Sequence, residues 1–230
     1  HARIIVTSAT LELEKISKFL KASKGLEVKT KCFPVEIFYK AVTSKQALST
    51  QVCENLEFLL PRYQGDVLIF MDGATLIKRT VHEIENRLGA KNLDVLALFG
   101  EMSHQAQDYV LSPSQKRKII VSTNLAETSL TIEGVSIVID TGMAKKHRFD
   151  PYRKVNVLLS EPISKSSASQ RAGRAGRLSP GICLRMWSEK EHALREEFDE
   201  AEIKRLDLSE IYLNLAASGC DPDTMNWYES

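Results

Sequence analysis

The sequence has no long apolar run, few cysteines and almost no net charge. No stretch approaches the roughly 18 apolar residues that a membrane-spanning helix needs, and the start His1-Ala2-Arg3-Ile4 lacks the regions of a signal peptide. The four cysteines, at positions 32, 53, 183 and 220, form no Cys-x-x-Cys pair and have no histidine at ligand spacing. We therefore expect a globular protein of the cytoplasm with isolated thiols and no membrane partner, and we assign no metal ligand.

The near-neutral balance of 31 Lys plus Arg against 30 Asp plus Glu hides two blocks of opposite sign. Residues 141–185 contain ten Lys or Arg and two acids, an excess of eight positive charges. Residues 189–210 contain nine acids and four Lys or Arg, an excess of five negative charges. A basic block is typical of a polyanion-binding surface, although a solvated charged surface explains it equally well.

Short apolar runs alternate with amphipathic helical patterns along most of the chain. The spacing of Val52, Leu56, Leu59 and Leu60 predicts one such helix, and a second pattern runs from Leu76 to Leu88. The alternation indicates an α/β domain with a largely parallel sheet, whose ligand would bind beyond the carboxyl ends of the strands. The predicted strands cover residues 2–6, 67–71, 95–99, 118–121, 136–140 and 182–186.

Two regions break this alternation. Residues 144–160 contain the turn signal Phe149-Asp150-Pro151-Tyr152 between basic and alternating apolar residues, which predicts a basic β-hairpin. The rings of Phe149 and Tyr152 could stack on bases, but packing on their own domain is the simpler expectation. After about Glu189 the chain becomes acidic and helical, and leucines from 206 to 215 predict a helix that needs a partner outside this chain. We interpret both ends as truncated.

The octet from Gln170 to Arg177 is the most specific segment. Its arginines, at positions 171, 174 and 177, recur every three residues, so a helix would carry them along one stripe. Guanidinium groups match phosphate oxygens, and an arginine directed at a γ-phosphate stabilises charge in phosphoryl transfer. The alternative is a surface helix paired with the acidic tail.

The octet resembles motif VI of superfamily-two helicases in the form found in the DEAH/RHA family. Residues 122–131 (STNLAETSLT) resemble motif V, Ser8-Ala9-Thr10 resembles motif III, and residues 67–73 resemble motif IV more weakly. Within the family, the tail resembles the bacterial HrpB type. The order and spacing of motifs V and VI carry most of the resemblance.

The resemblance implies a RecA-like three-layer domain with a mainly parallel central sheet and a protruding β-hairpin. Residues 1–28 would be the end of a first RecA-like domain, residues 29–190 the second RecA-like domain, and residues 191–230 the helical start of a winged-helix domain. ATP would bind between the two RecA-like domains. The Mg²⁺ ligands would lie in the first domain, because the chain has no Gly-x-x-x-x-Gly-Lys-Ser/Thr loop and no Asp-Glu-x-His.

The resemblance also assigns roles around ATP. Gln170 would help to place the attacking water or the γ-phosphate, and Arg174 and Arg177 would be arginine fingers. Arg171 would be structural or bound to neighbouring acids. Ser8, Ala9 and Thr10 would couple the two motor domains.

Four further residues would contact the nucleotide. Thr131 and Glu133 fall at the ribose, although many family members carry Asp where this chain has Glu133. Leu111 stands where many members place an aromatic residue against the adenine, and Gly142 is assigned to the same nucleotide. Thr128 and Ser129 fit helix capping and function equally well, and Asp140 could form a turn or act in the site.

On the nucleic-acid side, Thr123 and Asn124 would hold an RNA phosphate, together with Gly73 of motif IV. Asp72 precedes this glycine where the family usually has Thr, and we expect its carboxylate to point away from RNA or the contact to be lost. The hairpin would add Lys145 and Arg148.

The predicted function is the C-terminal motor domain of an ATP-dependent helicase from bacteria, inactive as an isolated fragment. Its partners would be single-stranded RNA, with DNA as a second candidate, and the first RecA-like and winged-helix domains of the same protein. The alternative is a degenerate helicase domain that acts as a binding scaffold without ATPase activity.

Overall fold

The computed structural model describes residues 5–6, 13–20, 25–26, 32–89, 92–128, 130, 132–225 and 227. The chain divides into two compact units. The larger contains residues 32–146 and 158–199, and the smaller contains residues 1–31, 147–157 and 200–230. Among the described residues, no helix combines the length and the apolar character needed to cross a bilayer.

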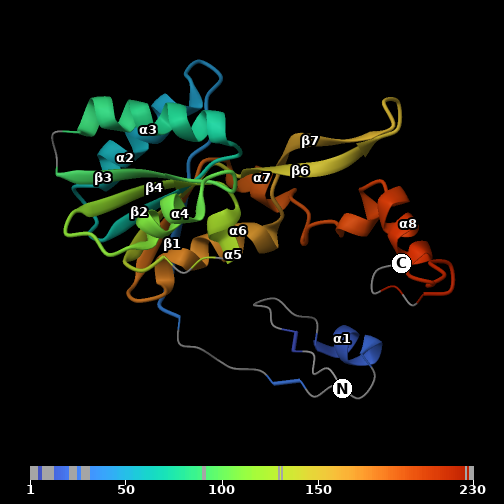
Figure 1. Cartoon of the computed structure of the whole chain (residues 1–230). Helices are drawn as coiled ribbons and strands as arrows, with labels where there is room; N and C mark the ends of the chain where they lie inside the picture. Colours follow the sequence, from blue (N-terminus) through green and yellow to red (C-terminus); the bar gives the residue numbers. More distant parts are fainter. Residues whose placement is uncertain are drawn as a thin grey trace. The chain divides into compact units, whose positions relative to one another are not determined.

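A six-stranded sheet with the order β1-β8-β5-β2-β4-β3 forms the centre of the larger unit (Figure 1). All its neighbouring strands pair in parallel, which confirms the predicted α/β class. The sequence analysis did not predict the edge strand β1. The strands are β1 (Val35–Tyr39), β2 (Asp66–Phe70), β3 (Leu93–Leu98), β4 (Arg117–Ser122), β5 (Val135–Asp140) and β8 (Gly181–Arg185).

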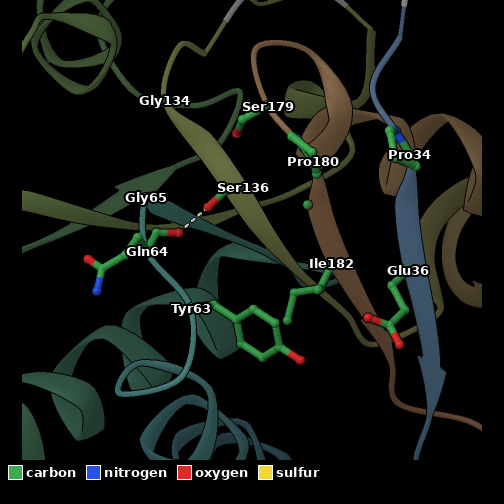
Figure 2. A pocket seen from close by; sticks show the side chains of 11 residues that line it. Pro34, Glu36, Tyr63, Gln64, Gly65, Gly134, Ser136, Ser179, Pro180 and Ile182 are labelled. Atoms are coloured by element: carbon green, nitrogen blue, oxygen red, sulfur yellow. Dashed lines mark hydrogen bonds between the residues drawn. The ribbon is translucent and has the colours of Figure 1, made fainter.

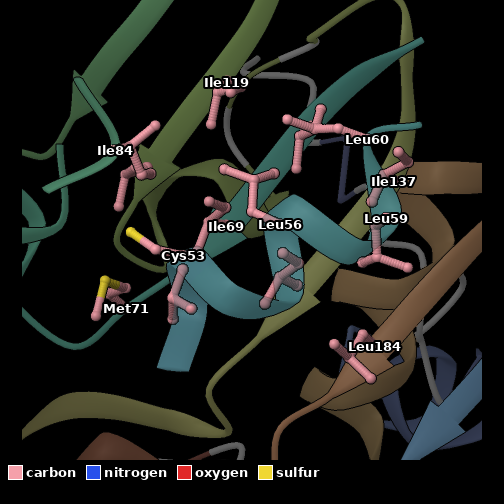
Figure 3. Packing of buried hydrophobic residues seen from close by; sticks show 14 of the residues in the cluster. Cys53, Leu56, Leu59, Leu60, Ile69, Met71, Ile84, Ile119, Ile137 and Leu184 are labelled. Carbon is pink, nitrogen blue, oxygen red and sulfur yellow. The ribbon is translucent and has the colours of Figure 1, made fainter. Parts of the chain in front are cut away.

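Helices cover both faces of this sheet and make it the middle of three layers. On one face, α2 (Leu48–Leu59) and α3 (Ala74–Leu88) pack against strand residues such as Ile69 (Figure 3). On the other face, α4 (His104–Leu111), α5 (Leu125–Thr128) and α6 (Lys165–Gly173) pack against residues such as Leu68. Because successive strand residues point to opposite faces, Leu68 and Ile69 belong to different core clusters.

The helix patterns in the sequence are largely correct. In α2, Val52, Leu56 and Leu59 are buried as their spacing predicts. In α3, Thr80, Ile84 and Leu88 are buried as predicted. At the start of the helix Ile77 is completely buried, whereas the predicted Leu76 is only partly buried. The cysteines are all free thiols, and burial raises the pKa of Cys53 to about 12.

A separate two-stranded sheet, β6 (Met143–Asp150) and β7 (Val155–Pro162), confirms the predicted hairpin (Figure 1). Its turn is formed by Asp150, whose carboxylate accepts hydrogen bonds from the backbone N–H groups of Tyr152 and Arg153 at 2.9 and 3.1 Å. A short helix, α7 (Glu189–Ala193), follows β8 in the larger unit.

The smaller unit contains α1 (Leu13–Phe19), the short 3₁₀ helix η2 (Glu202–Lys204) and α8 (Ser209–Ala217). The helix expected from the leucines at 206–215 is α8, and none of its residues is buried. The domain boundaries at 28 and 190, and the winged-helix start, stay predictions.

Gly176→Ala should destabilise the larger unit by about 2 kcal/mol. A Cβ at Gly176 would lie 2.6 Å from the carbonyl oxygen of Phe33 and 2.7 Å from a methyl group of Val35. Gly173→Ala is the matched control, because a Cβ there meets open space and Ala favours the helix by about 0.5–1 kcal/mol. Urea unfolding of both variants checks the pair, and equal destabilisation would contradict the packing argument.

Candidate functional site

A groove opens at the edge where the parallel strands β2, β3 and β4 end. It has a volume of about 600 Å³ and is formed by the segments that follow these strands and by the base of the hairpin. Its lining residues are Met71, Asp72, Gly73, Ala74, Thr75, Gly100, Glu101, Thr123, Asn124, Leu125, Lys145 and Leu158.

The groove brings together four of the five residues that the sequence predicted to bind nucleic acid: Gly73, Thr123, Asn124 and Lys145. Gly73 precedes α3, whose first turn has no side-chain cap, so its backbone N–H groups are available to a ligand. A Cβ on Gly73 would lie 3.0 Å from the Cε atom of Lys145, which shows how closely the lysine passes over this backbone. Asp72, for which we expected either a carboxylate pointing away from RNA or a lost contact, also lines the groove.

The fifth residue, Arg148, lies in the smaller unit, where its guanidinium binds the Glu200 carboxylate at 2.7 Å.

The two aromatic residues of the hairpin differ in solvent exposure. Tyr152 is 96% exposed, so the expectation that it packs on its own domain is wrong, whereas Phe149 is 37% exposed.

The octet forms the end of α6 and the 3₁₀ helix η1 (Arg174–Gly176), and its arginines do not share one environment. Arg171 is completely buried, and its guanidinium binds the carboxylates of Glu127 at 2.9 Å and Asp140 at 2.8 Å. Burial alone would lower the pKa of Arg171, but these two carboxylates outweigh it and raise the pKa. The expectation that Arg171 binds neighbouring acids is confirmed. The expectation that all three arginines share one stripe is wrong, because Arg171 is buried.

Two acids hold this network together. Asp140 both forms a turn, by accepting the N–H of Gly142 at 2.9 Å, and pairs with Arg171. Glu127 accepts the Ser167 hydroxyl at 2.7 Å through its carboxylate, and its backbone carbonyl accepts Arg174 Nε at 3.0 Å. The sequence analysis did not identify Glu127. Its position as the acid within residues 122–131 could have indicated an ion-pair partner for the arginines of the octet.

Arg174 is 3% exposed and is held by the backbone carbonyls of Glu127 and Leu130. Its Nη2 atom is buried and has no hydrogen-bond partner in the described part of the chain. Burial and then the positive charge of Arg177 lower the pKa of Arg174 to about 10. Arg177 itself is exposed. A buried, unpaired guanidinium nitrogen beside a second cation fits an anionic ligand such as a phosphate.

Motifs V and VI both cross one face of the sheet from its carboxyl edge to its amino edge. Helix α6 begins near Gly142, whose carbonyl accepts the N–H of Ile163 at 3.0 Å. The octet ends near the start of β1, where the Gly176 carbonyl accepts the N–H of Phe33 at 2.8 Å. Motif V starts at Ser122, the last residue of β4, and leads towards the beginning of β5. One end of each motif therefore lies at each edge.

This arrangement separates the residues predicted to contact the nucleotide. Glu133 is exposed just before β5 at the amino edge, and Leu111 packs at the end of α4 on the same face as α6. Gly142 follows β5 at the opposite edge, where a Cβ would lie 2.6 Å from both Trp187 and Arg195. Gln170 is half-buried in α6. Thr131, Ser8, Ala9 and Thr10 lie outside the described residues.

A second cavity, of about 500 Å³, lies at the amino edge of the sheet (Figure 2). Tyr63, Ile182 and Glu36 line it, and the Ser136 hydroxyl donates to the Gln64 carbonyl at its rim. None of the residues predicted from the sequence to act in the site lines this cavity.

Residues 49–179 match the family described as "Helicase conserved C-terminal domain". The chain belongs to this family. The match covers more than half of the chain and contains motif V and the whole octet.

The helicase domain is similar to longer proteins. It is 41% identical over 222 residues to the ATP-dependent RNA helicase HrpA of Borreliella burgdorferi, covering 94% of this chain and 27% of that protein. It is 33% identical over 230 residues to HrpB of Escherichia coli, covering 99% of this chain and 28% of HrpB. The chain thus spans less than a third of these relatives. The chain therefore resembles HrpA as well as HrpB.

A solved structure of the Escherichia coli DEAH/RHA helicase HrpB superposes on the domain with a TM-score of 0.90 at 33% identity, covering 97% of this chain and 29% of that one. This agreement confirms the expected RecA-like three-layer fold and the resemblance to DEAH/RHA helicases.

Asp140→Ala should destabilise the helicase domain by about 3 kcal/mol, because it breaks one of the two ion pairs that compensate the buried charge of Arg171 and leaves only Glu127. The matched control is Glu197→Ala, which removes a 3.3 Å pair with Lys165 in which Glu197 is 66% exposed; its effect should be at most about 1 kcal/mol. Thermal and urea unfolding measure both, and similar small effects would show that the buried pair contributes little.

Proposed function

We propose that this chain is the C-terminal motor domain of an ATP-dependent RNA helicase, which binds ATP through motif VI and single-stranded RNA through the groove. The observation that carries the proposal is that motif V joins the two proposed sites: Thr123 and Asn124 line the groove, and the backbone carbonyls of Glu127 and Leu130 hold Arg174 of motif VI. HrpA and HrpB, whose names describe ATP-dependent RNA helicases, support the same function for the whole protein.

On the nucleotide side, ATP supplies the phosphoryl group that is transferred to water. Arg174 keeps its charge at neutral pH despite its lowered pKa, and its Nη2 atom, buried and without a partner in the described part of the chain, would gain one from a phosphate oxygen if the segment opens to ATP. Arg177 adds a second guanidinium at the surface, and Gln170 orients water or the γ-phosphate. Glu133 and Thr131 bind the ribose, and Leu111 packs on the adenine. Mg²⁺ is held by residues of the first RecA-like domain.

On the nucleic-acid side, the groove supplies donors for a phosphate backbone. The uncapped first turn of α3 after Gly73 presents backbone N–H groups, and Lys145 contributes an ammonium group with no ion pair in the described part of the chain. Thr123 adds its hydroxyl and Asn124 its side-chain amide at the end of β4, whereas the backbone N–H of Thr123 donates to the Leu98 carbonyl at 3.1 Å. These contacts recognise the phosphate backbone and do not discriminate between bases.

The two sites communicate through motif V. Thr123 and Asn124, near its start, line the groove, and further along the same segment the carbonyls of Glu127 and Leu130 hold Arg174. A shift of this segment on RNA binding therefore moves acceptors of the arginine finger. The proposal includes the first RecA-like domain and a winged-helix domain as partners, and a bacterial cytoplasmic setting that agrees with the bacterial relatives.

Arg177→Ala should lower kcat for ATP hydrolysis by the full-length helicase about 10³-fold or more, the usual effect of losing an arginine finger. Since Arg177 is exposed, the thermal unfolding temperature should not change. Arg87→Ala is the control, because Arg87 pairs only with Glu83 on the surface of α3. Wild-type turnover in Arg177→Ala would contradict the arginine-finger role.

Lys145→Ala should weaken binding of single-stranded RNA and reduce the slope of log K against log salt by about 0.7, the value expected for one lost phosphate contact. Lys116→Ala, at the opposite edge of the sheet beside Asp94, should leave affinity and slope unchanged. Fluorescence anisotropy at several salt concentrations measures both. An unchanged slope in Lys145→Ala would contradict a phosphate contact in the groove.

A further inference from the structure

Glu127 of motif V is bound by three side chains of α6 and η1. One of its carboxylate oxygens accepts the Ser167 hydroxyl at 2.7 Å, and the other accepts Arg171 Nε at 2.9 Å. The backbone carbonyl of the same residue accepts Arg174 Nε at 3.0 Å. Because Arg171 and Arg174 lie four and seven residues after Ser167, about two turns of helix hold a single residue of motif V.

Ser167 is a rigid support for this contact. It is 5% exposed and lies in the first turn of α6, where its backbone N–H donates to the side chain of the N-cap residue Ser164 at 3.1 Å. The two N–H groups between these serines donate to the carbonyls of Glu196 and Glu197 at 2.8 and 3.0 Å. The first three N–H groups of α6 therefore all have partners, and the backbone that carries the Ser167 hydroxyl is fixed.

The backbone at Glu127 has much less support of its own. It belongs to α5, a helix of four residues, which is too short to be stable without tertiary contacts. Its N–H donates to the carbonyl of Asn124 at 2.9 Å, inside the segment that also lines the groove. The position of the Glu127 carbonyl therefore depends on where its carboxylate is anchored on α6.

Two contacts hold that carboxylate better than one. A carboxylate bound at a single oxygen can turn about that contact, whereas contacts at both oxygens fix its position and its plane. Without the Ser167 hydroxyl, only the ion pair with Arg171 remains. A turn of the carboxylate then shifts the carbonyl that holds Arg174, and a misplacement of about 1 Å at a reacting group can lower a rate about a hundredfold.

We propose that Ser167 is a positioning residue for ATP hydrolysis, which through Glu127 holds Arg174 where its guanidinium meets the phosphates of ATP. The inference rests on the proposed function, because it assumes that Arg174 contacts ATP. Ser167 contributes no chemistry of its own, since its hydroxyl proton stays in the hydrogen bond to Glu127 throughout.

Other roles for this hydroxyl lead to different results. If it only satisfied a buried carboxylate, its loss would lower the unfolding temperature and leave kcat unchanged wherever the variant is folded. If it supported ATP binding in general, KM for ATP would rise with kcat unchanged. A positioning role lowers kcat and leaves KM unchanged, because the contacts to the base and ribose are untouched.

The test is a double-mutant cycle in the full-length helicase. ATP hydrolysis is measured with saturating oligouridine, at a temperature well below the lowest unfolding temperature of the variants. Ser167→Ala should lower kcat about tenfold and keep KM for ATP within about twofold of wild type. Arg174→Lys keeps the charge but loses the guanidinium donors, and it should lower kcat about a hundredfold or more. Adding Ser167→Ala to Arg174→Lys should lower kcat no further, because the first change acts through the second residue.

Ser169→Ala is the matched control. Ser169 is an exposed residue of the same helix, and its hydroxyl donates back to the Lys165 carbonyl at 2.9 Å within α6. This variant should keep the wild-type kcat and KM. An unchanged kcat in Ser167→Ala, an equal loss in Ser169→Ala, or a further tenfold loss in the double variant would overturn the inference and leave the proposed function standing. Wild-type kcat in Arg174→Lys would instead refute the role of motif VI in the proposed function.

Discussion

The buried charge of Arg171 is the constraint on which the rest of the domain depends. A guanidinium with no solvent exposure is tolerable only with charged partners in good geometry, and Glu127 and Asp140 provide them. The Met143 carbonyl accepts a further hydrogen bond at 3.2 Å, and the Phe70 ring centroid lies 4.8 Å from the guanidinium carbon. One side chain thus ties together β2, the end of β5, the start of the hairpin and motif V, so the framework of both proposed sites depends on the same ion pairs.

The change from α-helix to 3₁₀ helix after Gly173 divides the octet into a part that is buried in the core and a part that we propose to face ATP. Before it, Arg171 points into the core from α6. After it, the tighter turn brings residues three apart into line, which suits a pair formed by Arg174 and Arg177. Arg174 is intermediate in character, because backbone carbonyls fix two of its nitrogens and leave the third for a ligand.

The features that could be predicted from the sequence are those that depend on local residue patterns and on the order of strands and helices along the chain. Central strands such as β4 are apolar on both faces and were found, whereas β1 carries Glu36 among apolar residues at the sheet edge and was missed. The groove was predictable because parallel strands bring their carboxyl ends to one edge. The different roles of Arg171 and Arg174 were expected from the family resemblance, but the particular acceptors of Arg171 were not predictable from local pattern, because they lie 44 and 31 residues away in the sequence. The positions of Arg148 beside Glu200 and of Gly142 beneath Trp187 likewise depend on distant segments.

The pairing of basic residues within the chain has a consequence for how a polyanion approaches it. Of the ten basic residues in 141–185, half already have acidic partners: Lys146, Arg148, Arg153, Lys165 and Arg171. The long-range field is therefore much weaker than the formal excess of positive charge in this block implies, and electrostatic steering contributes little to the rate of association. If the proposed groove binds a nucleic acid, the binding free energy would therefore come more from short-range contacts in the groove than from the formal charge of residues 141–185.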